Sequence, residues 1–236
     1  YRRSKQITIL LDKLINEFPR ITSLLYVINK KANDTIYDQK IHCYYGRDHI
    51  YEKILDFKFK IDAKSFYQTN SNQTKELYKI VKNFAKIKSN EVVYDLYSGI
   101  GTISIFIANQ AKKVIGIETV NEAVLAAKEN LTLNSIKNVS FFTGEIKNVL
   151  NTNFVKENGM PDTVIIDPPR SGMHKKALTN LLDIGPKKII YVSCNSATQA
   201  RDLDLFKDFY EIVCSQSIDM FPQTYHVENV VLLEKR

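Results

Sequence analysis

The feature that most constrains the fold is an alternation of strand-like and helix-like segments that runs from about residue 71 to the end of the chain. Short apolar runs such as EVVYDLY, KVIGIET and KKIIYVSC are separated by segments with helical spacing, for example NEAVLAAKENLTLN. Alternation of this kind predicts a largely parallel sheet covered by helices on both faces. Ligands of such sheets bind at the carboxyl ends of the strands, so the polar residues there are the candidate site.

The pattern also predicts where the individual elements lie. A helix capped by Ser71 or Asn72 opens this region, further strands are expected in VSFFTG and DTVIIDPP, and YEIVCSQSIDMFPQTYHVENVVLLEK reads as two strands joined by a proline-containing loop. Before it, residues 4–19 have helical spacing, and ITSLLYVIN, KIHCYYG, HIYEKIL and FKFKID read as strands of an antiparallel sheet. The predicted fold is therefore α/β, doubly wound, preceded by a smaller α+β segment.

Composition and charge narrow the class of protein. The chain has 236 residues, of which 44% are hydrophobic and 25% charged, which is typical of a globular protein. It contains no apolar run of about 18 residues, so we expect no membrane partner and a cytoplasmic location. A net charge of +7 favours a polyanionic partner such as nucleic acid.

The three cysteines, Cys43, Cys194 and Cys214, are far apart and form no C-x-x-C pair. No zinc ribbon or iron–sulfur cluster can be built from them, so we expect no metal in this chain. Cys43 and Cys214 lie in strand-like runs, where we expect buried thiols that act as small hydrophobes. Cys194 differs, because it follows a strand directly and precedes a helix.

A nucleotide-like ligand is indicated at the first two strand ends. Asp95 closes one strand, Gly99 and Gly101 open the next helix, and Glu118 ends the following strand, where a carboxylate can hold the two hydroxyls of a ribose. The third glycine of the dinucleotide fingerprint is missing, so a simple tight turn is the alternative. Nicotinamide, flavin and S-adenosylmethionine cofactors all carry an adenosine ribose, and these residues do not choose among them.

Three later segments carry polar residues toward the same edge. Asp167 ends a strand and is followed by the rigid pair Pro168-Pro169, Cys194 ends the next strand, and the C-terminal loop contains DMFPQTYHVE. The alternative for Asp167 is a simple strand-terminating turn, that for Cys194 is a buried inert thiol, and that for Glu228 in the C-terminal loop is a surface carboxylate. Together they indicate one crevice.

Six segments in this order resemble the RNA uracil-5-methyltransferase family: FYQTN, DLYSGIGT, GIE, DPPRSG, VSCNSATQARDL and DMFPQTYHVENVVLLEK. The resemblance covers about residues 66 to 235. It implies a Rossmann-like class I methyltransferase fold, S-adenosylmethionine as cofactor, and RNA as substrate.

The resemblance also implies roles for the reacting residues. Cys194 would add to carbon 6 of uracil, so that carbon 5 can attack a methyl group, and Glu228 would then remove the proton from carbon 5. A free thiol is only a few per cent ionised at neutral pH, so we expect the strand end, and the N-terminus of the following helix, to lower the pKa of Cys194.

The family's cofactor-contacting positions correspond here to Gln68, Tyr97, Glu118 and Asp167, with Asp95, Gly99 and Gly101 shaping the same loop. Two positions depart from the family pattern: Ser98 stands where many members have cysteine, and Thr102 where some have asparagine. Glu145 is a candidate for the adenine amino group or an exposed carboxylate, and His226 either lines the uracil pocket or packs beside Phe221.

The target uridine must leave its stack to meet a thiol, so aromatic side chains should receive it. Tyr67, Phe221 and Tyr225 are the candidates, and Arg170 and Arg201 are candidates for phosphate contacts. The pairs Lys175-Lys176 and Lys187-Lys188 are interpreted as solvated charge.

We expect residues 1–65 to be the remainder of a central α+β domain, cut at its N-terminus, and residues 66–236 to be the catalytic domain. An RNA-binding module, with an iron–sulfur site in some relatives, would precede them, and this segment alone should bind S-adenosylmethionine yet methylate RNA poorly. The preferred substrate is 23S ribosomal RNA, with transfer RNA as the alternative and no protein partner evident. Amino methylation of a base, or RNA binding without catalysis, are the competing hypotheses.

Overall fold

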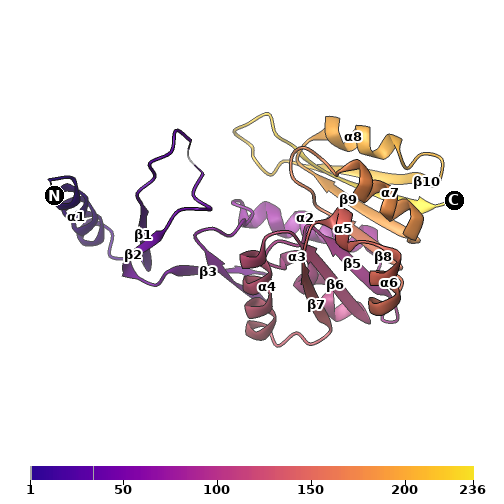
Figure 1. Ribbon diagram of the computed structural model, residues 1–236, viewed down its shortest axis with the longest axis horizontal. Coiled ribbons are helices and arrows are strands. Elements are labelled where there is room, and N and C mark those ends of the chain that lie inside the picture. The colour runs from indigo at the N-terminus through magenta and orange to yellow at the C-terminus, as the bar shows by residue number, and fades with distance from the viewer. Residues whose placement is uncertain (1, 34) are drawn as a thin grey trace.

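A seven-stranded sheet forms the centre of the protein (Figure 1). The computed structural model describes residues 2–33 and 35–236, with side chains from residue 5 onward. The strand order is β10-β11-β9-β8-β5-β6-β7; β9, β8, β5, β6 and β7 are parallel, and β11 runs antiparallel to both of its neighbours. The strands are β5 (Val92–Leu96), β6 (Lys113–Glu118), β7 (Val139–Thr143), β8 (Thr163–Ile166), β9 (Lys188–Ser193), β10 (Tyr210–Ile218) and β11 (Glu228–Lys235).

Helices cover both faces of the sheet, and alternate residues of each strand belong to two separate cores. In β9, Ile190 and Val192 join the core under the first helix group, whereas Ile189 and Tyr191 join the core under the second. The first helix group consists of α2 (Ser71–Ala85), α3 (Thr102–Ile107) and α4 (Asn121–Leu133), and α3 continues into a 3₁₀ turn, η1 (Ala108–Gln110). The second helix group consists of α5 (Ile146–Val149), α6 (Thr152–Asn158), α7 (Lys175–Ile184) and α8 (Ser196–Asp204). This confirms the doubly wound α/β prediction.

The N-terminal segment extends away from this body (Figure 1). It consists of α1 (Arg2–Glu17) and four strands, β1 (Ser23–Val27), β2 (Ile41–Gly46), β3 (His49–Ile54) and β4 (Phe57–Asp62). The four strands pair as two separate antiparallel hairpins rather than as the single sheet that the sequence suggested. The reason is packing, because the second hairpin packs against α4 and the core beneath it instead of extending the first hairpin.

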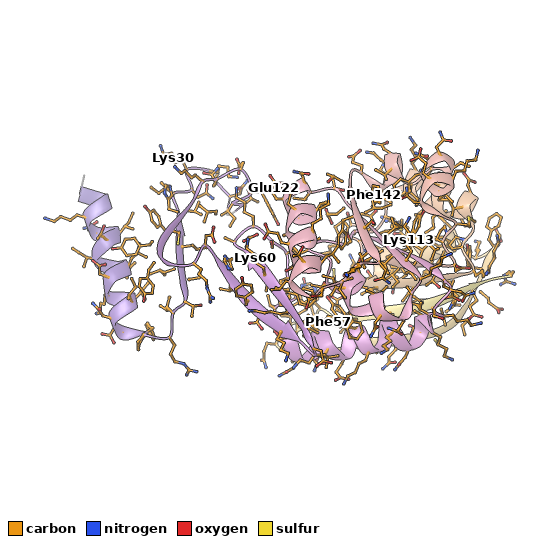
Figure 2. All side chains as sticks on the ribbon, turned by 90° about the horizontal axis from the view of Figure 1, so that it is seen from below. Lys30, Phe57, Lys60, Lys113, Glu122 and Phe142 are labelled. Atoms are coloured by element: carbon orange, nitrogen blue, oxygen red, sulfur yellow. The ribbon has the colours of Figure 1, made fainter. Side chains whose placement is uncertain are left out.

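Contacts between β4 and α4 hold the second hairpin on the body. The Lys60 ammonium pairs with Glu129 at 2.8 Å, and the Lys60 backbone amide donates to the Asn130 side chain at 2.8 Å. Figure 2 shows Lys60 on this hairpin beside α4. Phe59 and Ile61 are buried in the same core as α3 and α4, so the hairpin and the large sheet share one apolar interior.

Two local predictions are wrong. The cap of α2 is Asn70, whose side chain accepts from the amide of Gln73, and neither Ser71 nor Asn72 takes that place. Cys43 is exposed, because its side chain lies on the open face of the small β1–β2 hairpin, whereas Cys214 is half-buried as expected of a strand thiol.

Candidate active site

Cys194 and Glu228 are brought together by the pairing of β9 with β11. Asn229 pairs with Ser193 in antiparallel register, so the next residue outward on each strand is Glu228 and Cys194 respectively. Asp167, which follows β8, lies close enough that the charge of Glu228 adds to burial in raising the pKa of Asp167, and the charges of both carboxyls add to burial in raising the pKa of Cys194. Three segments distant in sequence thus place a thiol and two carboxyls at one edge of the sheet.

Glu228 is buried, with 4% of its surface exposed. Burial raises its pKa to about 7, because a carboxylate loses its hydration there and the described residues offer it no cation. A carboxyl group with this pKa is partly ionised at neutral pH, which suits a general base.

The thiol of Cys194 is not activated by its surroundings, contrary to the sequence-based expectation. Burial, followed by the nearby charges of Glu228 and Asp167, raises its pKa, and Arg170 only partly opposes them. At the N-terminus of α8, the Asn195 side chain accepts from the amides of Ala197 and Thr198, so these two amides are already paired within the protein. The free protein therefore holds the thiol in its protonated form.

A narrow cavity lies beside these groups. Five of the predicted cofactor-binding residues line it: Gln68, Asp95, Tyr97, Gly99 and Asp167. Burial raises the pKa of Asp95 to about 7 and that of Asp167 to about 8. The cavity thus has a surplus of acidic groups.

Among the described residues, several that line this cavity have buried polar atoms without a hydrogen-bond partner. One oxygen of Asp95 accepts from the Ser104 hydroxyl at 2.5 Å, but the other, Oδ1, is buried without a hydrogen bond, as is the Ser98 hydroxyl. Buried polar atoms without partners cost about 1–3 kcal/mol each. Donors or acceptors on a ligand would remove this cost.

The loop after β5 is held from the next strand. The Glu118 carboxylate accepts from the amide of Gly99 at 3.0 Å and from that of Val120 at 2.9 Å. This contact places the Glu118 carboxylate beside Gly99, which lines the narrow cavity. The Tyr97 backbone adopts a left-handed conformation with φ of 64°, which is costly for a residue with a side chain and directs its ring between two cavities.

Gly99 and Gly101 serve different purposes. A methyl group built on Gly99 would meet no atom within 4 Å, so its open side faces the ligand space. One built on Gly101 would come within 2.5 Å of the Phe141 ring. Gly101 is therefore a packing residue, whereas Gly99 leaves space beside the backbone.

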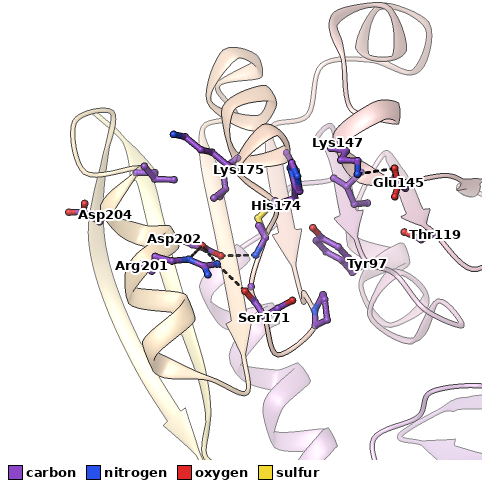
Figure 3. Close-up of a pocket in the computed structure, with 17 residues that line it drawn as sticks. Tyr97, Thr119, Glu145, Lys147, Ser171, His174, Lys175, Arg201, Asp202 and Asp204 are labelled. Atoms are coloured by element: carbon purple, nitrogen blue, oxygen red, sulfur yellow. Dashed lines mark hydrogen bonds and ion pairs between the residues drawn. The ribbon is translucent and has the colours of Figure 1, made fainter. Parts of the chain in front are cut away.

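A second, larger cavity adjoins the first at Tyr97 (Figure 3). Its volume is about 760 Å³, and it runs from Thr119 and Glu145, at the ends of β6 and β7, toward α7 and α8. The Glu145 carboxylate is half-exposed and pairs with Lys147 at 3.2 Å. The two cavities together follow the carboxyl ends of four neighbouring strands.

Buried Asp202 fixes the turn that follows Asp167. Its carboxylate accepts from the Tyr191 hydroxyl at 2.6 Å and from the Met173 amide at 2.7 Å, and it also pairs with Arg201. Arg201 in turn donates to the Ser171 carbonyl at 3.0 Å (Figure 3). The guanidinium of Arg201 is thus engaged within the protein, and the interpretation of Arg201 as a phosphate contact loses its geometric basis.

The aromatic residues at the mouth differ from those expected. Phe66, which sequence reasoning missed, is 69% exposed and lines the narrow cavity, and Tyr225 is 84% exposed. Tyr67 also lines this cavity while it packs partly against the core, and Phe221 packs partly against the core. The signal for Phe66 was its place as the first residue of FYQTN, one of the segments that carry the family resemblance.

His226 contacts Arg170 rather than Phe221. Both ring nitrogens of His226 lie 3.5 Å from guanidinium nitrogens of Arg170, and the Tyr225 ring is 4.2 Å from the imidazole. Arg170 remains exposed and close to Cys194. The 219–227 loop therefore covers the arginine that follows Asp167.

Other predicted features lie away from this edge. Lys187 pairs with Asp162, and Lys188 reaches the carbonyl of Ala85, so these lysines are engaged in structural contacts. Among the described residues, no group of three or more His, Cys, Asp or Glu side chains could hold a metal ion. The helices within residues 2–33 and 35–236 include none that is long and apolar enough to cross a membrane.

Comparison with known proteins decides the family. The profile of the family described as tRNA (uracil-5-)-methyltransferase matches residues 37–236. The chain belongs to this family. A protein of Bacteroides thetaiotaomicron named as an uncharacterized RNA methyltransferase is 52% identical over 227 residues, which is 96% of this chain and 50% of that protein. A relative with the same name from Porphyromonas gingivalis is 54% identical over 95% of this chain and 49% of its own length.

Solved structures agree with the family. The tRNA (uracil-54, C5)-methyltransferase of Pyrococcus abyssi, in complex with S-adenosyl-L-homocysteine, superposes with a TM-score of 0.78 and 32% identity, over 93% of this chain and 52% of that one. The tRNA m1G37 methyltransferase of M. jannaschii, at 15% identity and a TM-score of 0.62 over 95% of this chain and 66% of that one, shares the fold. The fold is that of a class I Rossmann-like methyltransferase, and this uracil-5-methyltransferase chain spans about half the length of the curated relatives it matches.

Proposed function

We propose that the protein methylates carbon 5 of a uridine in RNA, with S-adenosylmethionine as methyl donor and Cys194 as a covalent nucleophile. The observation that carries this proposal is the placement of Cys194 beside Glu228 through the β9–β11 pairing, next to the acidic cavity. Family membership and the P. abyssi structure support it. Amino methylation of a base would need neither the thiol nor Glu228.

The acidic cavity fits S-adenosylmethionine. This cofactor carries a positive sulfonium and a positive ammonium group, and the cavity contains Asp95 and Asp167, whose pKa values are raised chiefly by burial. Asp95 Oδ1 and the Ser98 hydroxyl are buried without partners and can bind the methionine end. Tyr97 separates this part from the larger cavity, where Ile146 and Pro169 can enclose the adenine. Glu118, which contacts Gly99, can hold the ribose.

When bound, S-adenosylmethionine supplies a methyl group that is electrophilic because its sulfur is positively charged. The thiolate of Cys194 adds to carbon 6 of the uracil, which forms an S–C6 bond and makes carbon 5 nucleophilic. The raised pKa of Cys194 in the free protein requires that the thiolate form after ligands arrive. The cofactor's positive charge near Asp167 favours that ionisation.

Glu228 completes the reaction as the base. After carbon 5 has accepted the methyl group it still carries its hydrogen, and the Glu228 carboxylate takes this proton. The electron pair of the broken C–H bond restores the ring double bond, and the S–C6 bond breaks to return the thiolate of Cys194. A base with a pKa of about 7 gains and loses protons readily at neutral pH.

The mouth of the site can receive a base taken out of its stack. Phe66 is exposed over the narrow cavity, Tyr225 projects from the 219–227 loop, and Arg170 lies between that loop and Cys194. Stacking on an aromatic side chain contributes about 1–3 kcal/mol per base. Arg170 offers the positive charge that a neighbouring phosphate needs.

The class of RNA that carries the target uridine is a separate part of the proposal. The sequence favours 23S ribosomal RNA, whereas the name of the family and that of the P. abyssi enzyme favour transfer RNA. The curated relatives are named only as RNA methyltransferases. The two RNA classes are therefore tested side by side.

Incubation of the full-length protein with S-adenosylmethionine and transcripts of 23S ribosomal RNA or transfer RNA that contain 5-fluorouridine tests the proposal. Fluorine at carbon 5 cannot leave as a proton, so a covalent complex should persist on a denaturing gel and map to Cys194 by mass spectrometry. The RNA that forms it identifies the substrate class. Absence of a complex with both RNAs would leave RNA binding without catalysis as the function.

A further inference from the structure

Gln199 on α8 is buried beneath the catalytic edge, with 2% of its surface exposed. Its Nε2 group donates to the carbonyl of Tyr191 at 2.9 Å and to that of Asn229 at 3.2 Å. Its Oε1 atom accepts from the Asn229 side chain at 2.7 Å. Gln199 therefore binds β9 once and β11 twice, and its amide group is fully used.

Asn229 extends these contacts to the next strand. Its Oδ1 atom accepts from the hydroxyls of Ser215 at 3.1 Å and Ser217 at 3.0 Å, both on β10. The hydrogen bonds run from α8 across the ends of β9 and β11 to β10. Polar networks of this kind are rigid when every member is satisfied.

We propose that Gln199 and Asn229 act as positioning residues that hold Glu228 at the distance from Cys194 that proton removal requires. This inference rests on the proposed function. Asn229 pairs with Ser193, so Glu228 and Cys194 are the next residues on either strand. Glu228 begins β11 after the 219–227 loop, which has no helix or strand. It pairs with Ile218 on β10, and the side-chain contacts of the next residue, Asn229, reinforce this start of the strand.

Cys194 has local restraints that do not depend on Gln199. The Asn195 amide donates to the Ser193 hydroxyl at 3.1 Å, and the Asn195 side chain donates to the Arg170 carbonyl at 3.2 Å. Loss of the contacts of Gln199 should therefore displace Glu228 more than Cys194. A misplacement of about 1 Å can cost roughly 100-fold in rate, and the affected step is removal of the carbon 5 proton.

The test is the variant Gln199→Leu of the full-length protein, which keeps the side-chain size but removes all three hydrogen bonds. In single turnover with S-adenosylmethionine and uridine-containing 23S ribosomal RNA or transfer RNA transcripts, product formation should fall about 100-fold. Methylated RNA should accumulate in covalent complex with Cys194, while the KM for S-adenosylmethionine stays within about twofold of the wild-type value.

Asn180→Leu is the matched control, because Asn180 on α7 donates similar side-chain bonds, to the carbonyls of Lys147 and Leu150, away from the reacting groups. It should lower the Tm without covalent accumulation. Asn229→Ala should reproduce the Gln199→Leu result, and the double variant should be no slower than either single one. The Asn229→Ala variant keeps the inference testable if Gln199→Leu does not fold.

Two outcomes overturn the inference. The first is that Gln199→Leu and Asn229→Ala both form product at the wild-type rate. The second is that both variants lose rate only in proportion to their loss of Tm, as Asn180→Leu does, and accumulate no covalent RNA. Failure of the proposed function is distinguishable, because the wild-type protein would then form no 5-methyluridine on either transcript, and the inference would fall with it.

Discussion

Cys194 and Glu228 are the residues directly beyond one cross-strand pair, Ser193 with Asn229, in antiparallel β9 and β11. Their relative position is therefore set by a single strand pairing, although the two residues are far apart in the sequence. The arrangement also couples their ionisation, because the charge of Glu228 raises the pKa of Cys194. A base that has lost its proton opposes the formation of the thiolate, so the order of proton transfers matters to the reaction.

Replacement of Glu228 by glutamine should separate adduct formation from release. Glutamine cannot accept the carbon 5 proton, so methylated RNA should remain attached to Cys194. Product formation should fall by about 100- to 10,000-fold, the range that a positioned acid–base group contributes. Denaturing gels of single-turnover mixtures measure both species. Glu234→Gln, an exposed position on the same strand, should behave as wild type, and equal loss of adduct and product in Glu228→Gln would contradict the assigned role.

The rate of product release should depend on pH through Glu228. Burial raises its pKa from the ordinary 4.5 to about 7, and only the ionised form accepts a proton. The single-turnover rate should therefore rise about tenfold per pH unit below about 7 and flatten above it, unless ionisation of Cys194 adds a further rise. A profile from about pH 5.5 to 9 measures this. A rate that falls as pH rises through 7 would exclude Glu228 as the base.

Much of the fold followed from local pattern, because each buried strand alternates between two apolar cores and each helix has one apolar face. Residues Ile189 to Val192 are an example, since a four-residue apolar run before a polar strand end predicts a central parallel strand. The division of the N-terminal strands into two hairpins could not be predicted, because it depends on contacts such as that of Lys60 with Glu129, far apart in the sequence.

The candidate site was predictable in its residues but not in its electrostatics. Polar residues after parallel strands meet at one edge, so Asp95, Asp167 and Cys194 were found from position alone. The rise in the pKa of Cys194 was not, because it results from burial and from Glu228 and Asp167 in space. Gln199 was also missed, since a glutamine in a short helix gives no signal until its partner on β11 is known.

Binding of S-adenosylmethionine should lower the pKa of Cys194. The sulfonium charge would offset the carboxylates that, with burial, raise this pKa in the free protein. The pH dependence of iodoacetamide alkylation, followed by mass spectrometry in a Cys43→Ser and Cys214→Ser background, gives the midpoint. It should be lower with S-adenosylmethionine than with S-adenosylhomocysteine, whose sulfur is neutral. Identical midpoints with the two ligands would show that the sulfonium does not act on the thiol.

Alanine at the two loop glycines should have different effects. Gly99→Ala places its methyl group in open space, so it should fold with a modest loss of stability of about 1–2 kcal/mol for its left-handed backbone and bind S-adenosylmethionine more weakly. Gly101→Ala has the same backbone cost and also forces a methyl group against Phe141. Its Tm should fall further. Thermal unfolding and isothermal titration of both variants provide the comparison, and a larger loss of stability in Gly99→Ala would contradict it.

Stability of the ligand-free protein should fall as pH rises, because Asp167 and Asp95 are held in their protonated forms. Their pKa values are raised from 3.8 to about 8 and about 7, so between about pH 4 and 8 the unfolded chain releases protons that the folded chain retains, and the free energy of unfolding decreases through this window. Asp167→Asn cannot ionise, so its Tm should equal that of the wild type near pH 4 and exceed it by several degrees near pH 8, since about 1 kcal/mol shifts Tm by roughly 2–4 °C at this size.

Asp204→Asn, exposed on α8, should follow the wild-type curve. Scanning calorimetry at a series of pH values measures the difference, and a constant offset between Asp167→Asn and wild type would mean that Asp167 is ionised in the folded protein throughout. Saturating S-adenosylmethionine should reduce the difference at pH 8, because its positive charges stabilise the ionised carboxyl.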